Sequence, residues 1–140
     1  MFERILLAVD GSAHALRAAR VAGDLARAMN SKIVRIVVAY EGIPAYLGEP
    51  NLQFAIESRL KDAQEILQKA EETVGKTPAE IHTELIEGSP AEAIIEVART
   101  RDSHVIVIGS RGMGTLTGLV LGSTSQKVVS HAPCPVLIVR

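Results

Sequence analysis

The sequence predicts an open, five-stranded parallel α/β sheet with helices on both faces, in one domain over residues 1–140. Short apolar segments of strand length alternate strictly with longer amphipathic segments along the whole chain. The apolar fraction is 47% but the aromatic fraction is only 3%, so the core must consist of Val, Ile, Leu and Ala, which suits a parallel sheet covered by alanine-rich helices. A length of 140 residues supports one core, and the sequence contains no internal repeat or linker.

Five segments have the composition of strands. The segment 3–10 is short, apolar and closed by Asp-Gly, and 32–40 is apolar apart from Arg35, which must find a partner or reach solvent. The segment 80–88 alternates between apolar and polar residues, which indicates a strand with one wetter face at an edge of the sheet. The other two predicted strands are 104–109, the most continuously apolar segment, and 134–140.

Four helices are predicted between these strands. The first follows Ser12, a plausible N-cap, and a loop at 41–50 precedes the second, which is long and ends at Gly75. Pro90 occupies the first position of the third helix, and the fourth covers roughly 123–131. The apolar stripe of the long helix consists of Leu52, Ile56, Leu60, Ala63, Leu67, Ala70 and Val74.

The segment 105–129 begins as an apolar strand, ends as a helix and contains five glycines. Ligands of open α/β sheets lie beyond the carboxyl ends of the strands, where the winding direction reverses, and this segment begins at such an end. Glycines let backbone N–H groups approach phosphate oxygens, and the amides at the start of a helix attract anions. Serine and threonine hydroxyls at 123–125 could add donors, and Arg111 and Lys127 could add positive charge. These features predict a phosphate-binding loop.

Two common phosphate-binding patterns do not fit this loop. A Walker A motif needs Gly, four residues and Gly-Lys-Ser/Thr, and no such string occurs. The triplet Gly112, Gly114 and Gly118 approximates a dinucleotide fingerprint, but it follows the fourth strand and lacks the later acidic residue.

The spacing that fits is Gly109-x2-Gly112-x9-Gly122-Ser123, and it resembles the ATP-binding signature of the universal stress protein family. Four strings agree with that family: "AVDGS" after the first strand, "GSP" before the third helix, "GSRG" after the fourth strand and "GSTSQKVVSHAPCPVLIVR" at the end. The resemblance covers the whole chain and is to the single-domain, nucleotide-binding branch.

The resemblance implies a Rossmann-like sheet of strand order 3-2-1-4-5, in which Asp10 and Gly109 are neighbours. It also implies that Ala8, Asp10 and the end of the second strand, at Val38 or Ala39, surround the adenine and ribose of ATP. In the commoner family pattern, Ala8 corresponds to a proline and Val38 to a histidine. Contacts to ribose and phosphates, several through the main chain, are implied for Gly109, Gly112, Gly122, Ser123, Thr124 and Ser125.

Several of these residues also have simpler explanations. Asp10 could make a turn or cap the first helix, and Ser123 could cap the last one. Arg111 could be a solvated loop residue, and Lys127 could be exposed on its helix. Cys134 lies between two prolines and is expected to be a packed side chain rather than a nucleophile.

Other function classes are disfavoured by composition. A net charge of −1 gives no general affinity for nucleic acid or an anionic membrane, and the charged N-terminus is neither a signal peptide nor a membrane span. A single cysteine fits a reducing cytoplasm. We expect no metal site, because the four histidines lie in different elements without ligand spacing: His14, His82, His104 and His131.

The sequence favours binding ATP over cleaving it. Near the glycines there is no Walker lysine and no acidic pair for magnesium, so no catalytic residue is assigned, although Mg²⁺ could arrive on the phosphates. We expect an ATP-binding stress-response regulator that forms a homodimer by pairing the apolar edge strand 136–140 with its copy. The alternatives are a slow ATP hydrolase or nucleotidyl- or phosphoryl-transfer enzyme, and a partner-binding dimer with an empty pocket. The edge strand could instead be covered by its own helices.

Overall fold

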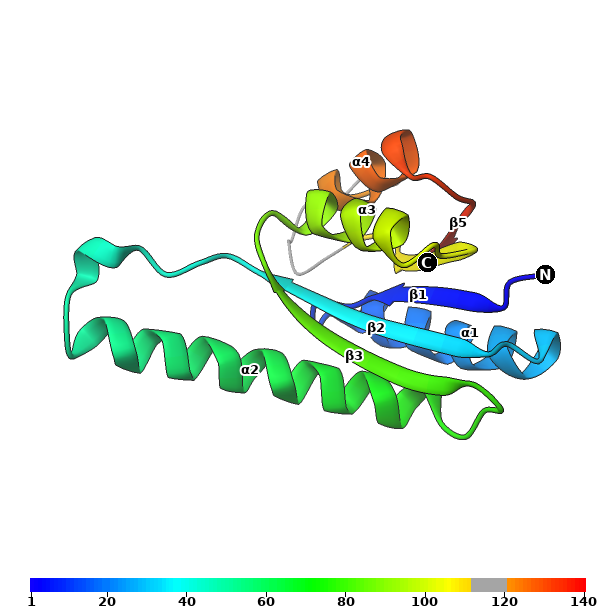
Figure 1. The fold of residues 1–140 in the computed structure, drawn as a ribbon, viewed down its shortest axis with the longest axis horizontal. Helices are drawn as coiled ribbons and strands as arrows, with labels where there is room; N and C mark the ends of the chain where they lie inside the picture. Colours follow the sequence, from blue (N-terminus) through cyan, green and yellow to red (C-terminus); the bar gives the residue numbers. More distant parts are fainter. Residues whose placement is uncertain (112–120) are drawn as a thin grey trace.

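The computed structural model describes residues 1–111 and 121–140. In this part of the chain, strands and helices alternate in the predicted order (Figure 1). The strands are β1 (Arg4–Ala8), β2 (Ile33–Tyr40), β3 (Glu80–Glu87), β4 (Val105–Gly109) and β5 (Val136–Val139). The α-helices are α1 (Ala13–Met29), α2 (Asn51–Val74), α3 (Pro90–Thr100) and α4 (Ser123–His131). The expectation of a plain loop at 41–50 is wrong in one respect, because this connection contains a short 3-10 helix, η1 (Ala45–Leu47).

The five strands form one sheet in which every neighbouring pair is parallel, and their order is β3-β2-β1-β4-β5, as the family resemblance implied. The central strand is β1, where Ala8 lies opposite Val37 of β2 and Ile108 of β4. The chain adds strands outward from β1 to β3 and then returns to the other side of β1 for β4 and β5. The winding direction therefore reverses between β1 and β4, the position where ligands of such sheets bind.

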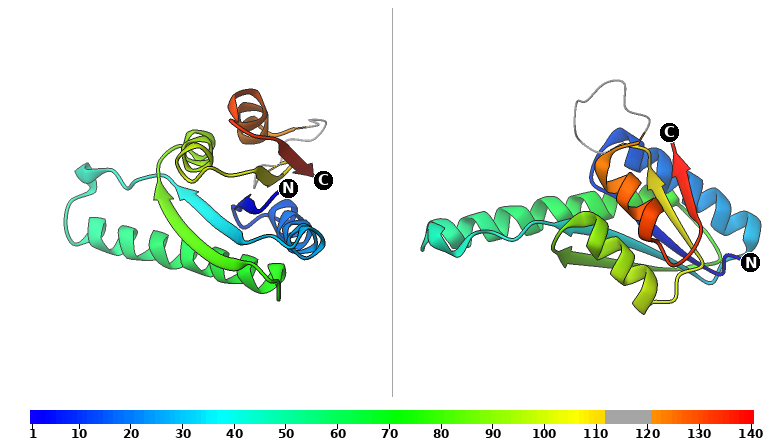
Figure 2. Two further views of the ribbon diagram at one scale, coloured as in Figure 1. Left: turned by 45° about the vertical axis from the view of Figure 1, so that its right-hand side comes forward. Right: turned by 90° about the horizontal axis from the view of Figure 1, so that it is seen from above.

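Each face of the sheet is covered by two helices (Figure 2). Helices α1 and α2 pack on one face, and α3 and α4 pack on the other. Successive strand residues point to opposite faces, so Leu7 contributes to the α1–α2 core and Leu6 to the α3–α4 core. Because both faces are buried, β1 and β4 are continuous apolar runs rather than alternating ones.

Helix α2 packs against the sheet over only part of its length. Of the predicted apolar stripe, the second half is buried: Ala63, Leu67, Ala70 and Val74. Leu52, Ile56 and Leu60 are only half-buried, because the N-terminal part of α2 extends past the sheet (Figure 1). The helix ends at Gly75, as predicted.

Local signals explain how α1 begins and how it packs. The Ser12 hydroxyl accepts a hydrogen bond from the Ala15 amide at 3.1 Å, which confirms the predicted N-cap. Gly23 lies where α1 crosses the end of α2: a Cβ atom there would be 2.3 Å from the Val74 carbonyl oxygen. Only a glycine therefore lets the two helices approach this closely.

Arg35, the one charged residue within β2, has the partner that the sequence required. Its guanidinium forms an ion pair with Glu84 on β3, and their side chains are only 13% and 22% exposed. Arg101, after α3, contacts the same carboxylate at 3.2 Å. Glu84 thus forms ion pairs with two arginines at the β2–β3 side of the sheet.

Candidate functional site

The carboxyl ends of β1 and β4 bring together residues that lie far apart in the sequence. Asp10 follows β1, and Gly109 is the last residue of the adjacent strand β4. The Asp10 side chain is exposed, and its Oδ1 accepts a hydrogen bond from the Ser12 amide at 2.9 Å. The turn predicted for Asp10 is thereby confirmed, and this turn leads directly into the first turn of α1.

Gly109 packs against the main chain of α1. A Cβ atom at position 109 would lie 2.8 Å from His14 Cβ and 2.9 Å from the His14 carbonyl carbon, closer than real Cβ atoms come. The missing side chain therefore makes room for the protein's own helix. That reason for the glycine is separate from the predicted approach to phosphate.

Ser110 links three elements at this edge, and its side chain is buried. Its amide donates to the Val139 carbonyl of β5 at 2.7 Å, and its own carbonyl accepts from the Gly122 amide at 2.7 Å. Its Oγ lies 3.3 Å from His14 Nδ1. The start of α4 is thus tied to the end of β4, with α1 alongside.

Helix α4 begins at this junction. Gly122 is its N-cap residue and provides no side-chain cap, so the suggestion that Ser123 caps this helix is wrong. The first amides of a helix have no partner within it, so they can donate hydrogen bonds to an anion. Ser123 is exposed and Thr124 half-buried, whereas the buried Ser125 hydroxyl donates to the Gly109 carbonyl at 2.8 Å. Ser125 therefore holds α4 against β4.

The predicted cations lie at different places. Arg111 follows Ser110 directly, is half-buried and lies close enough to His14 for their charges to interact. Lys127 contacts Glu92 of α3 at 3.0 Å, on the exposed side of α4. Arg111 is thus at the candidate site, and Lys127 forms a surface ion pair. Gly112 lies outside the described residues.

The predicted adenine-side residues do not share one face of the sheet. Ala8 belongs to the α3–α4 core, whereas Val38 is buried in the α1–α2 core. Ala39 follows Val38 in the strand, so it points to the same face as Ala8 and is half-buried. Ala8 and Ala39 therefore share the α3–α4 face, where Ala8 is only 5% exposed.

His14 was not singled out from the sequence, yet it lies among the candidate residues. Removal of its imidazole from solvent lowers its pKa, and the charges of Arg17 and Arg111 lower it further, while Asp10 acts in the opposite direction. Ser110 was missed as well. Ser110 lies within the Gly109-x2-Gly112 spacing, but its contact with His14 joins the end of β4 to α1 across the fold and leaves no local pattern.

Other possible sites lie elsewhere. A pocket of about 240 Å³ opens between α1 and α2 and contains none of the predicted residues; it is lined by Val9, Gly11, Ala15, Leu16, Asp62, Glu65, Ile66, Lys69 and Ala70. In residues 1–111 and 121–140, no three His, Cys, Asp or Glu side chains are grouped to hold a metal ion. Cys134 packs against the α3–α4 core, and burial raises the pKa of its thiol. No helix in the described part of the chain is long and apolar enough to cross a membrane.

Comparison with known proteins gives a consistent result. A model of the universal stress protein family matches residues 1–140. The Thermus aquaticus protein named "Universal stress protein in QAH/OAS sulfhydrylase 3'region" is 48% identical over 140 residues, with both chains covered completely.

Two solved structures share the fold. Universal stress protein UspA from Lactobacillus plantarum superposes with a TM-score of 0.86 at 26% identity, covering 99% of this chain and 98% of that chain. A universal stress protein in complex with cAMP superposes with a TM-score of 0.74 at 28% identity, covering 98% of this chain and 96% of that one. From the family model and the Thermus relative together, the chain belongs to the universal stress protein family.

Proposed function

We propose that this protein binds ATP at the carboxyl edge of β1 and β4 and acts as a nucleotide-dependent regulatory protein of the stress response. The observation that carries the proposal is the convergence of Asp10, Arg111 and the start of α4 where the winding of the sheet reverses. One solved member of the family was crystallised with cAMP, which is also an adenine nucleotide.

Each part of the nucleotide has a suitable partner at this edge. The phosphates would lie at the amides of Ser123 and Thr124, where the helix dipole favours negative charge, with the Arg111 guanidinium nearby. The ribose would contact the exposed Asp10 carboxylate. The adenine would lie against Ala8 and Ala39, on the α3–α4 face. Gly109, Gly112 and Gly122 would provide main-chain approach, and Mg²⁺ would arrive with the phosphates.

Ser125 and Val38 have supporting roles in this proposal. The Ser125 hydroxyl is engaged by the Gly109 carbonyl, so it would hold the two sides of the phosphate site together. Val38 is 3% exposed and would support the adenine-side backbone from the opposite core. We assign binding and regulation, and no catalytic residue.

We also propose that two copies pair along β5, in the cytoplasm. This strand is an edge of the sheet, and Leu137 on it is 38% exposed. An apolar edge strand with unpaired backbone groups is a template for a second copy. Sedimentation analysis of the purified protein tests this part, and a monomer at all accessible concentrations would contradict it.

The nucleotide proposal is tested by adding one negative charge at the start of α4. Thr124→Glu places a carboxylate where the phosphates would lie, so we expect calorimetry on nucleotide-free protein to show ATP binding to wild type and at least a tenfold loss in the variant. The same carboxylate interacts favourably with the positive end of the helix dipole, by about 0.5 kcal/mol. The free energy of unfolding should therefore not fall.

Ser130→Glu is the matched control, since it adds the same charge near the other end of α4. It should cost about 0.5 kcal/mol of stability by opposing the helix dipole, and it should leave ATP binding intact. Absence of ATP binding to wild-type protein, or equal affinity in wild type and Thr124→Glu, would refute the proposed site.

A further inference from the structure

His14 occupies an unusual position beside the proposed phosphate site. It is the second residue of α1, and its main chain is in contact with Gly109. Its Nδ1 lies 3.3 Å from the Ser110 hydroxyl, and the Ser110 carbonyl accepts the Gly122 amide at the start of α4. Ser110 thus connects the His14 imidazole, through its hydroxyl, to the start of α4, through its carbonyl. The phosphates are proposed to lie at this end of the helix.

The charges around His14 come from each element packed against it. Arg17 lies one turn further along α1, and Arg111 approaches from the end of β4, whereas Asp10, in the turn before α1, is acidic. Arg140, which follows β5, has a backbone oxygen that accepts a hydrogen bond from the Arg17 side chain at 3.0 Å. Of the charges that act on the His14 imidazole, Arg17 and Arg111 disfavour its protonation and Asp10 favours it. The positive end of the α1 dipole also disfavours an imidazolium.

In the free protein these surroundings favour the neutral form of the His14 imidazole. Removal from solvent is the largest cause, followed by Arg17 and Arg111, and together they lower the pKa of the imidazole. A bound phosphate would change the balance, because its negative charge would lie beside Arg111 and the start of α4. It would offset the cations that disfavour protonation of His14.

We propose that His14 couples nucleotide binding to proton uptake, so that this edge of the sheet binds adenine nucleotides more tightly as the pH falls; this inference rests on the proposed function. The direction of this pH dependence follows from thermodynamic linkage. A ligand that favours the protonated imidazole raises the pKa of His14, and protonation must then favour the ligand by the same factor. As the pH falls, the gain in affinity begins near the pKa of His14 in the complex. It is complete below the pKa of His14 in the free protein.

The test uses cAMP, because its phosphodiester has no ionisation near neutral pH, whereas the terminal phosphate of ATP has one near pH 6 of its own, by analogy with phosphate monoesters. Calorimetry in buffers of different ionisation enthalpy gives both the affinity and the number of protons taken up. Between about pH 8 and about pH 6, we expect wild-type affinity for cAMP to rise roughly three- to tenfold, with proton uptake.

Two variants distinguish His14 from other histidines. His14→Asn keeps a polar atom near the Ser110 hydroxyl but cannot become charged, so its affinity for cAMP should be independent of pH. His131→Asn changes an exposed histidine at the far end of α4 and should keep the wild-type pH dependence. Imidazole NMR spectra give a direct readout, in which added cAMP should shift the titration of the His14 signal to higher pH.

The outcomes separate this inference from the proposed function. If cAMP binds but wild type and His14→Asn share one pH profile, or if the His14 signal titrates identically with and without cAMP, the coupling is refuted and the nucleotide site stands. If neither cAMP nor ATP binds at any pH, the proposed function is wrong, and the coupling is wrong with it.

Discussion

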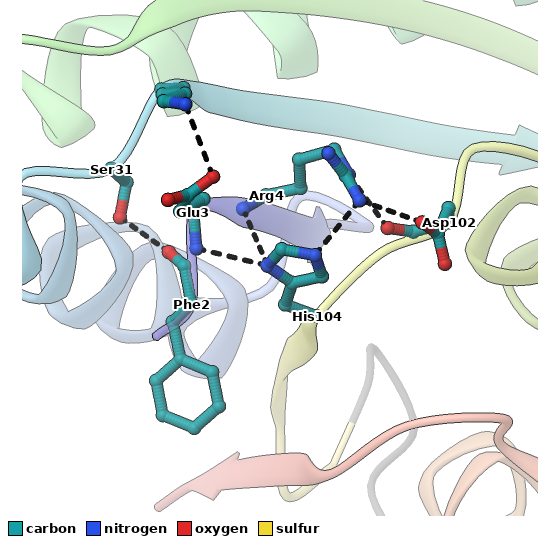
Figure 3. A network of polar contacts seen from close by, with 7 residues as sticks. Phe2, Glu3, Arg4, Ser31, Asp102 and His104 are labelled. Atoms are coloured by element: carbon teal, nitrogen blue, oxygen red, sulfur yellow. Dashed lines mark hydrogen bonds and ion pairs between the residues drawn. The ribbon is translucent and has the colours of Figure 1, made fainter.

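The two ends of β1 and β4 are built in different ways. At the amino end, side chains form hydrogen bonds with backbone groups and with one another (Figure 3). His104 Nδ1 accepts the Glu3 amide at 3.1 Å, the Arg4 guanidinium contacts Asp102 at 2.7 Å, and the Ser31 hydroxyl donates to the Phe2 carbonyl at 2.7 Å. The polar groups at this end of the sheet therefore have hydrogen-bonding partners within the chain.

At the carboxyl end, the connections run mainly through the backbone. The Ser110 amide and carbonyl bond to β5 and to the start of α4, and Gly109 lies directly against α1. Beside His14, the Arg17 guanidinium donates to the Arg140 backbone oxygen at 3.0 Å, and Asp10 accepts the Ser12 amide at 2.9 Å. A closely packed main chain with Arg17 and Arg111 beside it is suited to receive an anion.

The two ends of the sheet also differ in backbone conformation. In the part of the chain that the structure describes, three non-glycine residues have positive φ, and all three adjoin the amino end: Phe2, Asn30 and Asp102. Such conformations are unfavourable for a bulky residue such as phenylalanine, so surrounding contacts must maintain them. The comparison indicates that the amino end is stabilised by its polar network and that the carboxyl end depends on close backbone packing.

The largest predicted effect concerns that backbone packing. Gly109→Ala puts a methyl group against the main chain of α1 at His14, and we expect the free energy of unfolding to fall by about 2–3 kcal/mol. Urea denaturation measures the change. In the control, Gly42→Ala, the added methyl group meets only the flexible end of the Glu87 side chain, so about 0.5 kcal/mol or less is expected. Equal losses in the two variants would show that the Gly109 contact is not special.

A second prediction concerns the amino-end network. His104→Ala removes the acceptor of the Glu3 amide in a partly buried position and should cost about 1–2 kcal/mol, by the same measurement. His82→Ala breaks only an ion pair with Glu80, whose side chain is 80% exposed, and should cost less than about 0.5 kcal/mol. If His104→Ala is as mild as this control, the network does not stabilise the amino end.

Most of the fold could be predicted from the sequence because its signals are local. Ser12, Pro90 and Gly75 mark helix ends through interactions with their own neighbours, and strand burial follows from uninterrupted apolar residues. The partner of Arg35 required knowledge of register, since Glu84 lies on another strand. The need for a partner was evident from the sequence, but its identity was not.

The candidate site was predicted less completely, for a related reason. The glycine spacing predicted a phosphate-binding loop. However, one reason for a glycine at position 109 is its contact with His14, and α1 lies far earlier in the sequence. Ser110 lies between two predicted site residues, Gly109 and Arg111, but its own role arises only when α1, β5 and α4 meet around it. Side chains that act through long-range packing leave no periodic pattern in the sequence.

The smallest predicted effect returns to the carboxyl end. Ser125→Ala removes the buried hydroxyl that donates to the Gly109 carbonyl at 2.8 Å, and we expect a loss of about 1 kcal/mol in the free energy of unfolding. Ser130→Ala, on the same helix, removes an exposed hydroxyl that bonds to the Gln126 carbonyl within α4, so its change should be near zero. Because Ser125 connects α4 to β4, its loss should also weaken ATP binding severalfold, whereas Ser130→Ala should not. A Ser125→Ala protein with unchanged stability and affinity would show that backbone bonds alone maintain this end of the sheet, which would sharpen the contrast with the side-chain network at the other end.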